Sequence, residues 1–130
     1  MNDSLTLLGR IGLALIFLIF GVGKIAAYAG TQQYMQSVGV PGALLPLVIA
    51  LEVGGGLAIL FGLFTRFVAI AMAVFSLASA LLFHAHFADQ AQAINFWKNV
   101  SMAGGFLVLA AHGAGAYSLD AWLARRRGRR

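Results

Sequence analysis

Four long apolar runs follow one another along the chain, separated by short stretches that are more polar. They occupy about residues 5–27, 43–64, 66–86 and 95–116. A bilayer core about 30 Å thick needs roughly 20 residues of helix, so each run is long enough to cross it. The runs lack the alternation of barrel strands, and backbone groups in lipid must otherwise be satisfied within a helix. We therefore expect an all-α integral membrane protein, a four-helix up-and-down bundle formed by one domain over residues 1–130.

The connections between these runs are short, and only the first has a pattern of its own. Its sequence, "GTQQYMQSVGVPG", mixes glutamines with Tyr34, Met35 and Val38, and Pro41 is placed to begin the next helix. This mixture predicts a short interfacial helix between the first two spans. The segment Gly62 to Arg66 predicts a tight turn between the second and third runs.

Composition supports a membrane protein. The chain is 61% hydrophobic and only 10% charged, whereas about a quarter of an ordinary soluble domain is charged. It has no cysteine, which excludes thiol exchange, iron–sulfur clusters and c-type haem. Any redox role must then use a diffusible cofactor or a partner protein. His112 is expected at the opposite end of the bundle from His84 and His86, which argues against a bis-histidine haem, and we predict no metal site.

The basic residues predict the orientation. Four spans place both termini on one side, and that side collects the seven arginines, whereas Lys24 and Lys98 fall on the other. By the positive-inside rule, both termini are expected in the cytoplasm. The tail "RRRGRR" is interpreted as an anchor to the anionic lipid of the bilayer, and not as a nucleic-acid site. A signal peptide remains an alternative for the first run, although three spans would remain after its cleavage.

Glu52 is the one acid within the apolar runs. An ionised side chain at a helix centre costs about 2.5 to 3.5 kcal/mol on insertion scales, so Glu52 should face the bundle and find a partner. Lys24 lies near the end of the first run. Side chains lean toward the N-terminus of their helix, so in antiparallel neighbours Lys24 leans into the membrane and Glu52 leans toward it. We predict a buried ion pair between them in the outer half of the bundle.

Other residues at this depth predict a site around the pair. Arg10, Phe17 and Lys24 share one face of the first helix, and glycines beside Glu52 would let a helix or a flat ligand approach closely. The predicted ligand-binding residues are Phe17, Phe20, Gly21, Gly55, Gly56, Asn95, Asn99 and His84.

Each of these residues also has a structural explanation. Lys24 can extend to the surface, and Asn95 and Asn99 can cap a helix or bond between helices. His84 and His86 can be interfacial residues, and the glycines can serve helix packing. Glu52 is hardest to explain in this way, because structural acids within membranes are uncommon.

Several motifs together resemble the DoxX family of small bacterial inner-membrane proteins. They are "RIGLALIFLIFGVGK", "AYAGTQQYMQSVGVPG", "LEVGGGLAILFGLFTR" and "NVSMAGGFLVLAAHGAGAYSLD", which together cover nearly the whole chain. The resemblance implies a multi-pass protein of the bacterial inner membrane. It also implies an oxidoreductase, or a subunit beside a quinone-reducing membrane complex.

Two functional hypotheses follow. In the first, the chain is an oxidoreductase component that holds a quinone-like ring, with Glu52 and Lys24 as catalytic residues that relay protons or fix a carbonyl. Soluble or membrane redox proteins are then the expected partners. In the second, it is a non-catalytic subunit that binds or transports a small molecule, and the Glu52–Lys24 pair sets helix register. Small residues such as Ala69 and Ala73, which we expect to face lipid, leave a homo-oligomer open in both.

Overall fold

The computed structural model describes residues 2–85 and 87–128, and within them all regular structure is helical. Six α-helices and one 3₁₀ turn follow in the order α1 (Asp3–Ala26), α2 (Tyr28–Ser37), η1 (Gly42–Leu44), α3 (Leu45–Phe61), α4 (Thr65–Phe83), α5 (Gln90–His112) and α6 (Leu119–Gly128).

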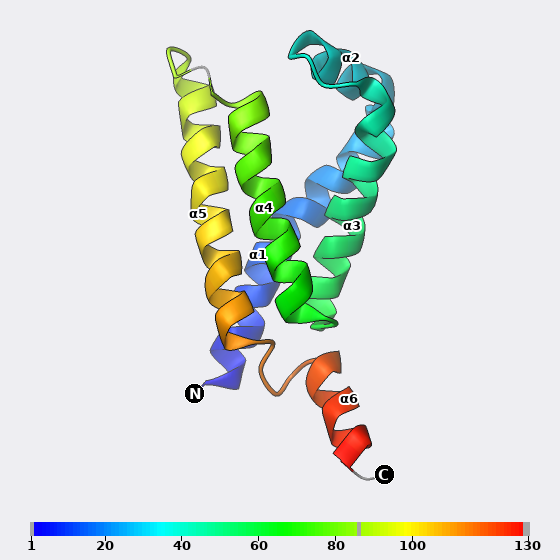
Figure 1. Cartoon of the computed structure of the whole chain (residues 1–130), viewed down its shortest axis with the longest axis vertical. Coiled ribbons are helices and arrows are strands. Elements are labelled where there is room, and N and C mark those ends of the chain that lie inside the picture. Colours follow the sequence, from blue (N-terminus) through cyan, green and yellow to red (C-terminus); the bar gives the residue numbers. More distant parts are fainter. Residues whose placement is uncertain (1, 86, 129–130) are drawn as a thin grey trace.

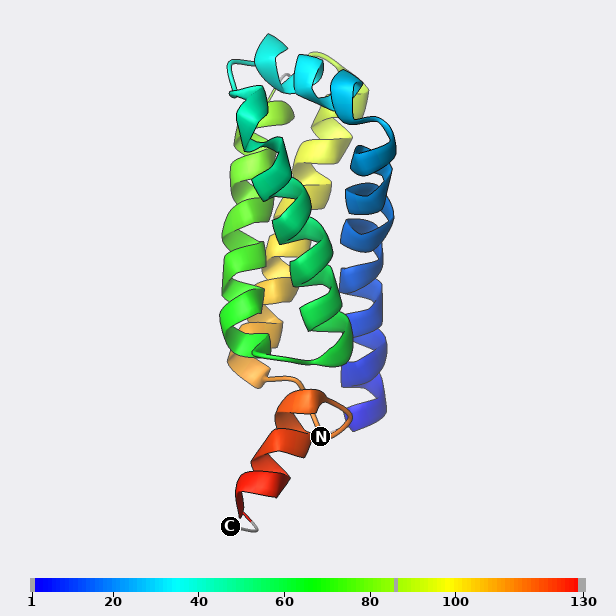
Figure 2. The same cartoon turned by 90° about the vertical axis from the view of Figure 1, so that its right-hand side faces the viewer.

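The four longest helices lie side by side as two pairs, α1 with α3 and α4 with α5 (Figures 1 and 2). Smaller contacts between α3 and α4 and between α1 and α5 join the pairs. Helix α2 lies across one end of the molecule, and α6 extends from the other end, where both chain termini lie. Below, these are called the α2 end and the α6 end. The two pairs diverge toward the α2 end (Figure 1).

The core is where the two pairs meet. Its largest fully buried apolar side chains are Phe106, Ile59 and Met72, and the same cluster holds Ala14, Ala69 and Ala73. The expectation that Ala69 and Ala73 face lipid is wrong, because this face of α4 packs against the neighbouring helices. Small residues at these contacts let the helices approach closely, as is usual where lipid surrounds a bundle.

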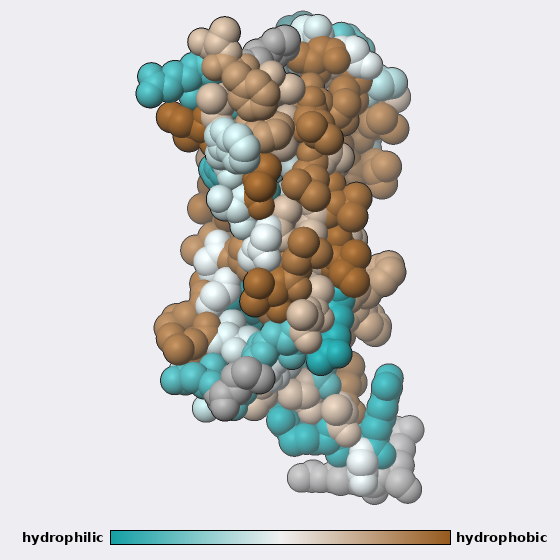
Figure 3. Space-filling model, turned by 60° about the vertical axis from the view of Figure 1, so that its left-hand side comes forward, coloured by the Kyte–Doolittle hydropathy of each residue, from teal (hydrophilic) through white to brown (hydrophobic). Residues whose placement is uncertain are grey.

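The outer surface is apolar along much of its length, as expected for contact with lipid. Among the described residues, three helical segments are long and apolar enough to cross a membrane: α1, the continuous stretch Gly42–Phe61, and α4. On the face shown in Figure 3, apolar side chains cover much of the middle, and hydrophilic side chains gather mainly toward the ends. Val108 and Phe67 are at least 70% exposed. Contact of such apolar side chains with water would be unfavourable, whereas contact with lipid is not.

Helix ends at the α6 end depend on backbone geometry that few residues adopt. Gly62 ends α3 with a φ of 70°, and Phe64 has a φ of 49° immediately before α4. The carboxylate of Asp120, in α6, accepts hydrogen bonds from the backbone N–H groups of Phe64 and Thr65 at 2.7 and 2.8 Å. Asp120 thus caps α4 from a distant part of the chain.

The structure confirms a short helix in the first connection, as α2, and a turn after α3. The turn covers residues 62–64 and not 62–66, because α4 already begins at Thr65. Helix α5 begins at Gln90 and not near Asn95, because the Asp89 side chain caps it by accepting the N–H of Ala91. It ends at His112 and not near 116, because Gly113 and Gly115 adopt positive φ. Helix α6 was not predicted, because its arginines were interpreted only as an anchor. His86 lies outside the described residues.

Candidate functional site

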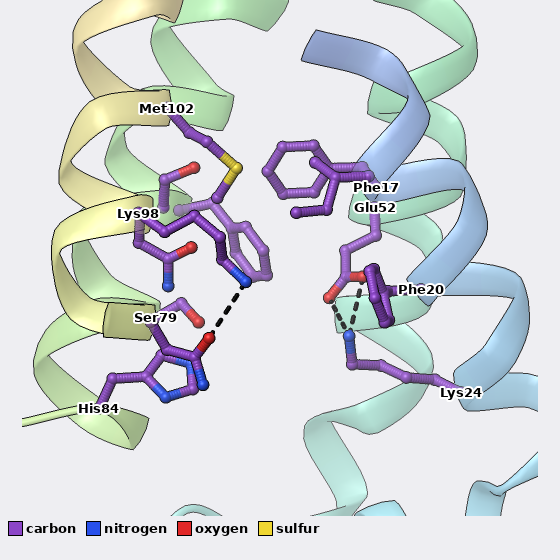
Figure 4. Close-up of a pocket in the computed structure, with 13 residues that line it drawn as sticks. Phe17, Phe20, Lys24, Glu52, Ser79, His84, Lys98 and Met102 are labelled. Carbon is purple, nitrogen blue, oxygen red and sulfur yellow. Dashed lines mark hydrogen bonds and ion pairs between the residues drawn. The ribbon is translucent and has the colours of Figure 1, made fainter. Parts of the chain in front are cut away.

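The predicted ion pair between Lys24 and Glu52 is confirmed. The Lys24 ammonium, in the last turn of α1, donates to both carboxylate oxygens of Glu52, in α3, at 2.8 and 2.9 Å (Figure 4). The Glu52 side chain is 5% exposed and that of Lys24 is 30% exposed. Each carboxylate oxygen therefore accepts one charge-assisted hydrogen bond from the same cation.

Glycines bring α1 and α3 close enough for this pair. A Cβ atom on Gly21 would lie 2.9 Å from Val53 Cγ2, and one on Gly56 would lie 3.0 Å from Leu18 Cδ2. Gly55 faces α4, where its Cβ would lie 2.5 Å from Met72 Sδ. These three glycines were predicted to bind a ligand, but the structure places them in helix contacts because neighbouring side chains fill the space beside them.

A cavity of about 330 Å³ opens beside the ion pair, between α1, α3, α4 and α5 (Figure 4). It contains the other predicted site residues: Phe17, Phe20, Lys24, Glu52, His84, Asn95 and Asn99. Ile16, Phe75, Ser76, Ser79, Lys98 and Met102 complete its lining. Residues on or next to four helices therefore line one cavity near the α2 end, and their role as a site stays a prediction.

Sequence reasoning included His84, at the end of α4, but missed the serines within this helix. Ser76 and Ser79 are the polar residues in its otherwise apolar run, and a spacing of three residues places them on one helix face. That pattern could have identified them. The Ser76 hydroxyl is buried and has no hydrogen-bond partner in the described structure.

Aromatic rings form much of the apolar wall. Phe17 is buried, and its ring centroid lies 5.6 Å from that of Phe106 and 6.3 Å from that of Phe75. Phe20 is more than half exposed. Such rings offer flat, polarisable contacts to a planar ligand.

The wall opposite the ion pair is polar. Figure 4 shows Lys98 and His84 across the cavity from Lys24 and Glu52. The Lys98 ammonium donates to Asn95 Oδ1 at 3.2 Å, and His84 Nδ1 lies 2.7 Å from Gln92 Oε1. When Nδ1 donates this bond, Nε2 remains able to accept one. Asn99 is buried beside them.

A second, smaller cavity of about 180 Å³ adjoins the first beneath α2, and Lys24, Glu52, Phe75, Ser79 and His84 line both. The additional lining is mainly apolar: Thr31, Tyr34, Met35, Leu45, Val48 and Phe83. The Tyr34 hydroxyl donates to the Phe83 carbonyl at 3.1 Å and links α2 to the end of α4. Helix α2 therefore covers this part of the site.

Arg10 belongs to a different region. It is 1% exposed and donates to the Tyr117 carbonyl, at the α6 end. Nearby, Thr6 Oγ1 lies 3.3 Å from His112 Nε2, and Asp3 accepts the N–H of Ala116 at 3.0 Å. Arg10 does share a helix face with Phe17, but the contacts at this end join α1 to the last residue of α5 and to the segment after it, and not to the cavity.

Comparisons with known proteins identify the family of this chain. The DoxX family model matches residues 5–85. The chain belongs to the DoxX family. It is 52% identical to Inner membrane protein YqjF of Escherichia coli K12, with 97% of each chain covered. It is 44% identical to Inner membrane protein YphA of the same organism, covering 89% of this chain and 88% of that one.

A third relative of this DoxX-family chain carries a name that describes an activity. It is "Putative oxidoreductase CatD" of Bacillus subtilis 168, 36% identical over 57% of this chain and 58% of its own length. No solved structure matched the chain. The Escherichia coli relatives and the three apolar helices show that this protein resides in the bacterial inner membrane.

Proposed function

We propose that this DoxX-family protein is an oxidoreductase component that holds a quinone-like ring in the cavity beside Lys24 and Glu52. The observation that carries the proposal is the buried ion pair facing a cavity with aromatic walls. Desolvation can cancel the attraction within such a pair, so helix stability alone is a weak reason for its presence. Ionisable groups at membrane depth usually serve a ligand or a proton path.

The lining suits a flat ring with oxygens at its edges. Carbonyl oxygens accept hydrogen bonds, and the Lys24 ammonium and the buried Ser76 hydroxyl can donate them. The Ser76 hydroxyl has no protein partner, which is unusual for a buried polar atom, and a ligand would satisfy it. The volume of about 330 Å³ is at the lower end of small-molecule sites and fits one or two fused rings.

The ion pair would supply protons. Reduction of a quinone by two electrons consumes two protons. The Lys24 ammonium can donate one proton at a time, and the ionised Glu52 can take up protons from water and return them to Lys24, so that two are delivered in succession. The electrons must come from a partner protein or a diffusible donor, because the chain has no cysteine. We therefore expect a soluble or membrane redox partner. The name of the relative CatD, which includes the word oxidoreductase, supports a redox function.

The proposal includes a topology with four spans. Helix α5 has 23 residues, enough to cross a bilayer, and its polar residues Asn95 and Asn99 line the cavity, away from lipid. The arginines toward the α6 end support cytoplasmic termini, by the positive-inside rule. The cavity then lies in the outer half of the bundle, with α2 at the outer interface.

Ligand binding tests the proposal. Purified protein in phosphatidylcholine nanodiscs is titrated calorimetrically with 2-methyl-1,4-naphthoquinone, alongside Glu52→Gln and the control Asp89→Asn. Asn and Asp cap helices about equally well, so the control should bind as the wild type does. We expect saturable binding that Glu52→Gln weakens about tenfold, since a neutral amide no longer holds Lys24 in place. If the wild type does not bind the quinone, the proposal fails and a non-catalytic subunit is favoured.

A further inference from the structure

Lys98 brings a charge to the cavity that no acidic side chain balances. The cavity contains two lysines, and Glu52 pairs with Lys24 through both of its oxygens. Lys98 is exposed, and its ammonium has one hydrogen-bond partner among the described residues, the neutral Asn95 amide oxygen at 3.2 Å. Figure 4 shows Lys98 reaching inward from α5, opposite the ion pair.

The other three acidic residues of the chain form hydrogen bonds outside the cavity. Of its four acidic residues, Asp3 and Asp120 accept backbone N–H groups at the α6 end. Asp89 caps the start of α5, and it precedes Lys98 by nine residues, about 13 Å along a helix. Lys24–Glu52 is the ion pair found among the described residues. Two ammonium groups and one carboxylate leave the cavity with one net positive charge.

A single uncompensated charge selects for an anion. A negative group on the ligand gains most beside a cation that the protein has not already neutralised, and Lys98, although exposed, lines the cavity beside buried Asn99. The neighbours of Lys98, which are Asn95, Asn99 and His84, can add hydrogen bonds without adding negative charge. Phe17, Phe20 and Phe75 leave room for the rest of the ligand to be a flat ring.

We propose that the natural ligand of this cavity is an aromatic ring compound carrying one negative charge, a ring carboxylate or a phenolate, and that Lys98 binds this charge. The inference rests on the proposed function, because it places the ligand in the same cavity, and it adds the charge that a neutral quinone lacks. Lys98 is then the residue that determines specificity, while Lys24 and Glu52 face the opposite side of the ring.

A matched pair of probes tests the proposal in nanodiscs of phosphatidylcholine alone. 2-Naphthoate carries the negative charge, and 2-naphthamide has nearly the same shape without it. We expect naphthoate to bind about tenfold more tightly than naphthamide. Lys98→Gln should abolish this preference. Its affinity for naphthamide should equal that of the wild type, and this equality would show that the cavity is intact. Lys98→Arg should retain most of the preference for naphthoate. Arg125→Gln, which removes an exposed charge from α6, should retain all of it.

The other outcomes separate this inference from the proposed function. If 2-methyl-1,4-naphthoquinone binds but naphthoate binds no more tightly than naphthamide, the quinone site stands and the charge specificity is wrong. If none of the three ring compounds binds, both fail. If added phosphatidylglycerol removes the naphthoate preference of the wild type by competition, Lys98 binds a lipid headgroup, and the inference is overturned.

Discussion

Both carboxylate oxygens of Glu52 accept hydrogen bonds from the same group, the Lys24 ammonium, at 2.8 and 2.9 Å. The contact joins the last turn of α1 to the first half of α3, and its carboxylate is almost fully buried. The pair lines both cavities. The same two side chains therefore hold α1 against α3 and would contact a bound ligand.

Removing one partner of this pair should destabilise the protein. Glu52→Gln leaves the ammonium without its counter-charge, and we expect a loss of about 1 to 3 kcal/mol, less than the roughly 3 to 5 kcal/mol of fully buried pairs. The difference arises because Lys24 is 30% exposed. Thermal unfolding in detergent measures the loss. The double variant Lys24→Glu with Glu52→Lys should be more stable than either single reversal, and equal stability would show that the pairing contributes nothing.

The packing role of the glycines predicts a contrast within α3. Gly56→Ala places a Cβ 3.0 Å from Leu18, which should push α1 from α3 and cost about 1 to 2 kcal/mol. Gly54→Ala is the matched control, because nothing lies within 4 Å of its Cβ. Alanine favours a helix by up to about 1 kcal/mol over glycine, so the control should be neutral or more stable. Thermal unfolding of both variants checks this, and similar losses would argue against close packing at Gly56.

Asp120 should stabilise the start of α4. Asp120→Ala removes the acceptor of the Phe64 and Thr65 N–H groups, and lost caps cost about 0.5 to 2 kcal/mol. Asp120→Asn should recover part of this loss, since an amide oxygen still accepts. Limited proteolysis at the turn of residues 62–64, together with thermal unfolding, measures the effect. If the alanine variant is as resistant and as stable as the wild type, the cap is unimportant.

Ser76→Ala should separate binding from stability. The hydroxyl is buried and unpartnered, so its removal should leave the free energy of unfolding unchanged or slightly higher. If the hydroxyl bonds the ligand, affinity for 2-methyl-1,4-naphthoquinone should fall about fivefold to tenfold. Calorimetric titration measures the affinity, and a thermal melt of the same preparation measures the change in stability. Unchanged affinity would remove Ser76 from the binding site.

Much of this structure could be predicted from residue patterns, for reasons that particular residues illustrate. The apolar runs determine the long helices, and the cost of an acid in lipid required Glu52 to find Lys24. Both arguments use local sequence together with one strong constraint, the high cost of leaving polar or charged groups unpaired in lipid. The role of Gly21 and Gly56 was harder, because a glycine can face a ligand or a neighbouring helix, and only the packing of α1 on α3 decides.

The α6 end was least predictable. The Asp120 cap on α4 joins residues 55 positions apart, and no periodicity in the sequence indicates such a contact. Arg10 likewise shares a helix face with Phe17, yet the carbonyl it meets belongs to Tyr117. The α4 serines were visible in the sequence, but their role needed the position of α4 relative to α1 and α5.

Photolabelling tests the central claim most directly. A photoreactive azido derivative of 2-methyl-1,4-naphthoquinone is bound to the protein in nanodiscs and illuminated, and the labelled residues are mapped by mass spectrometry. The account predicts labels on cavity residues from α1, α4 and α5, such as Phe20, Phe75 and Met102, and their loss when excess unlabelled quinone competes. Labels confined to lipid-facing residues such as Val108, and insensitive to competition, would contradict it.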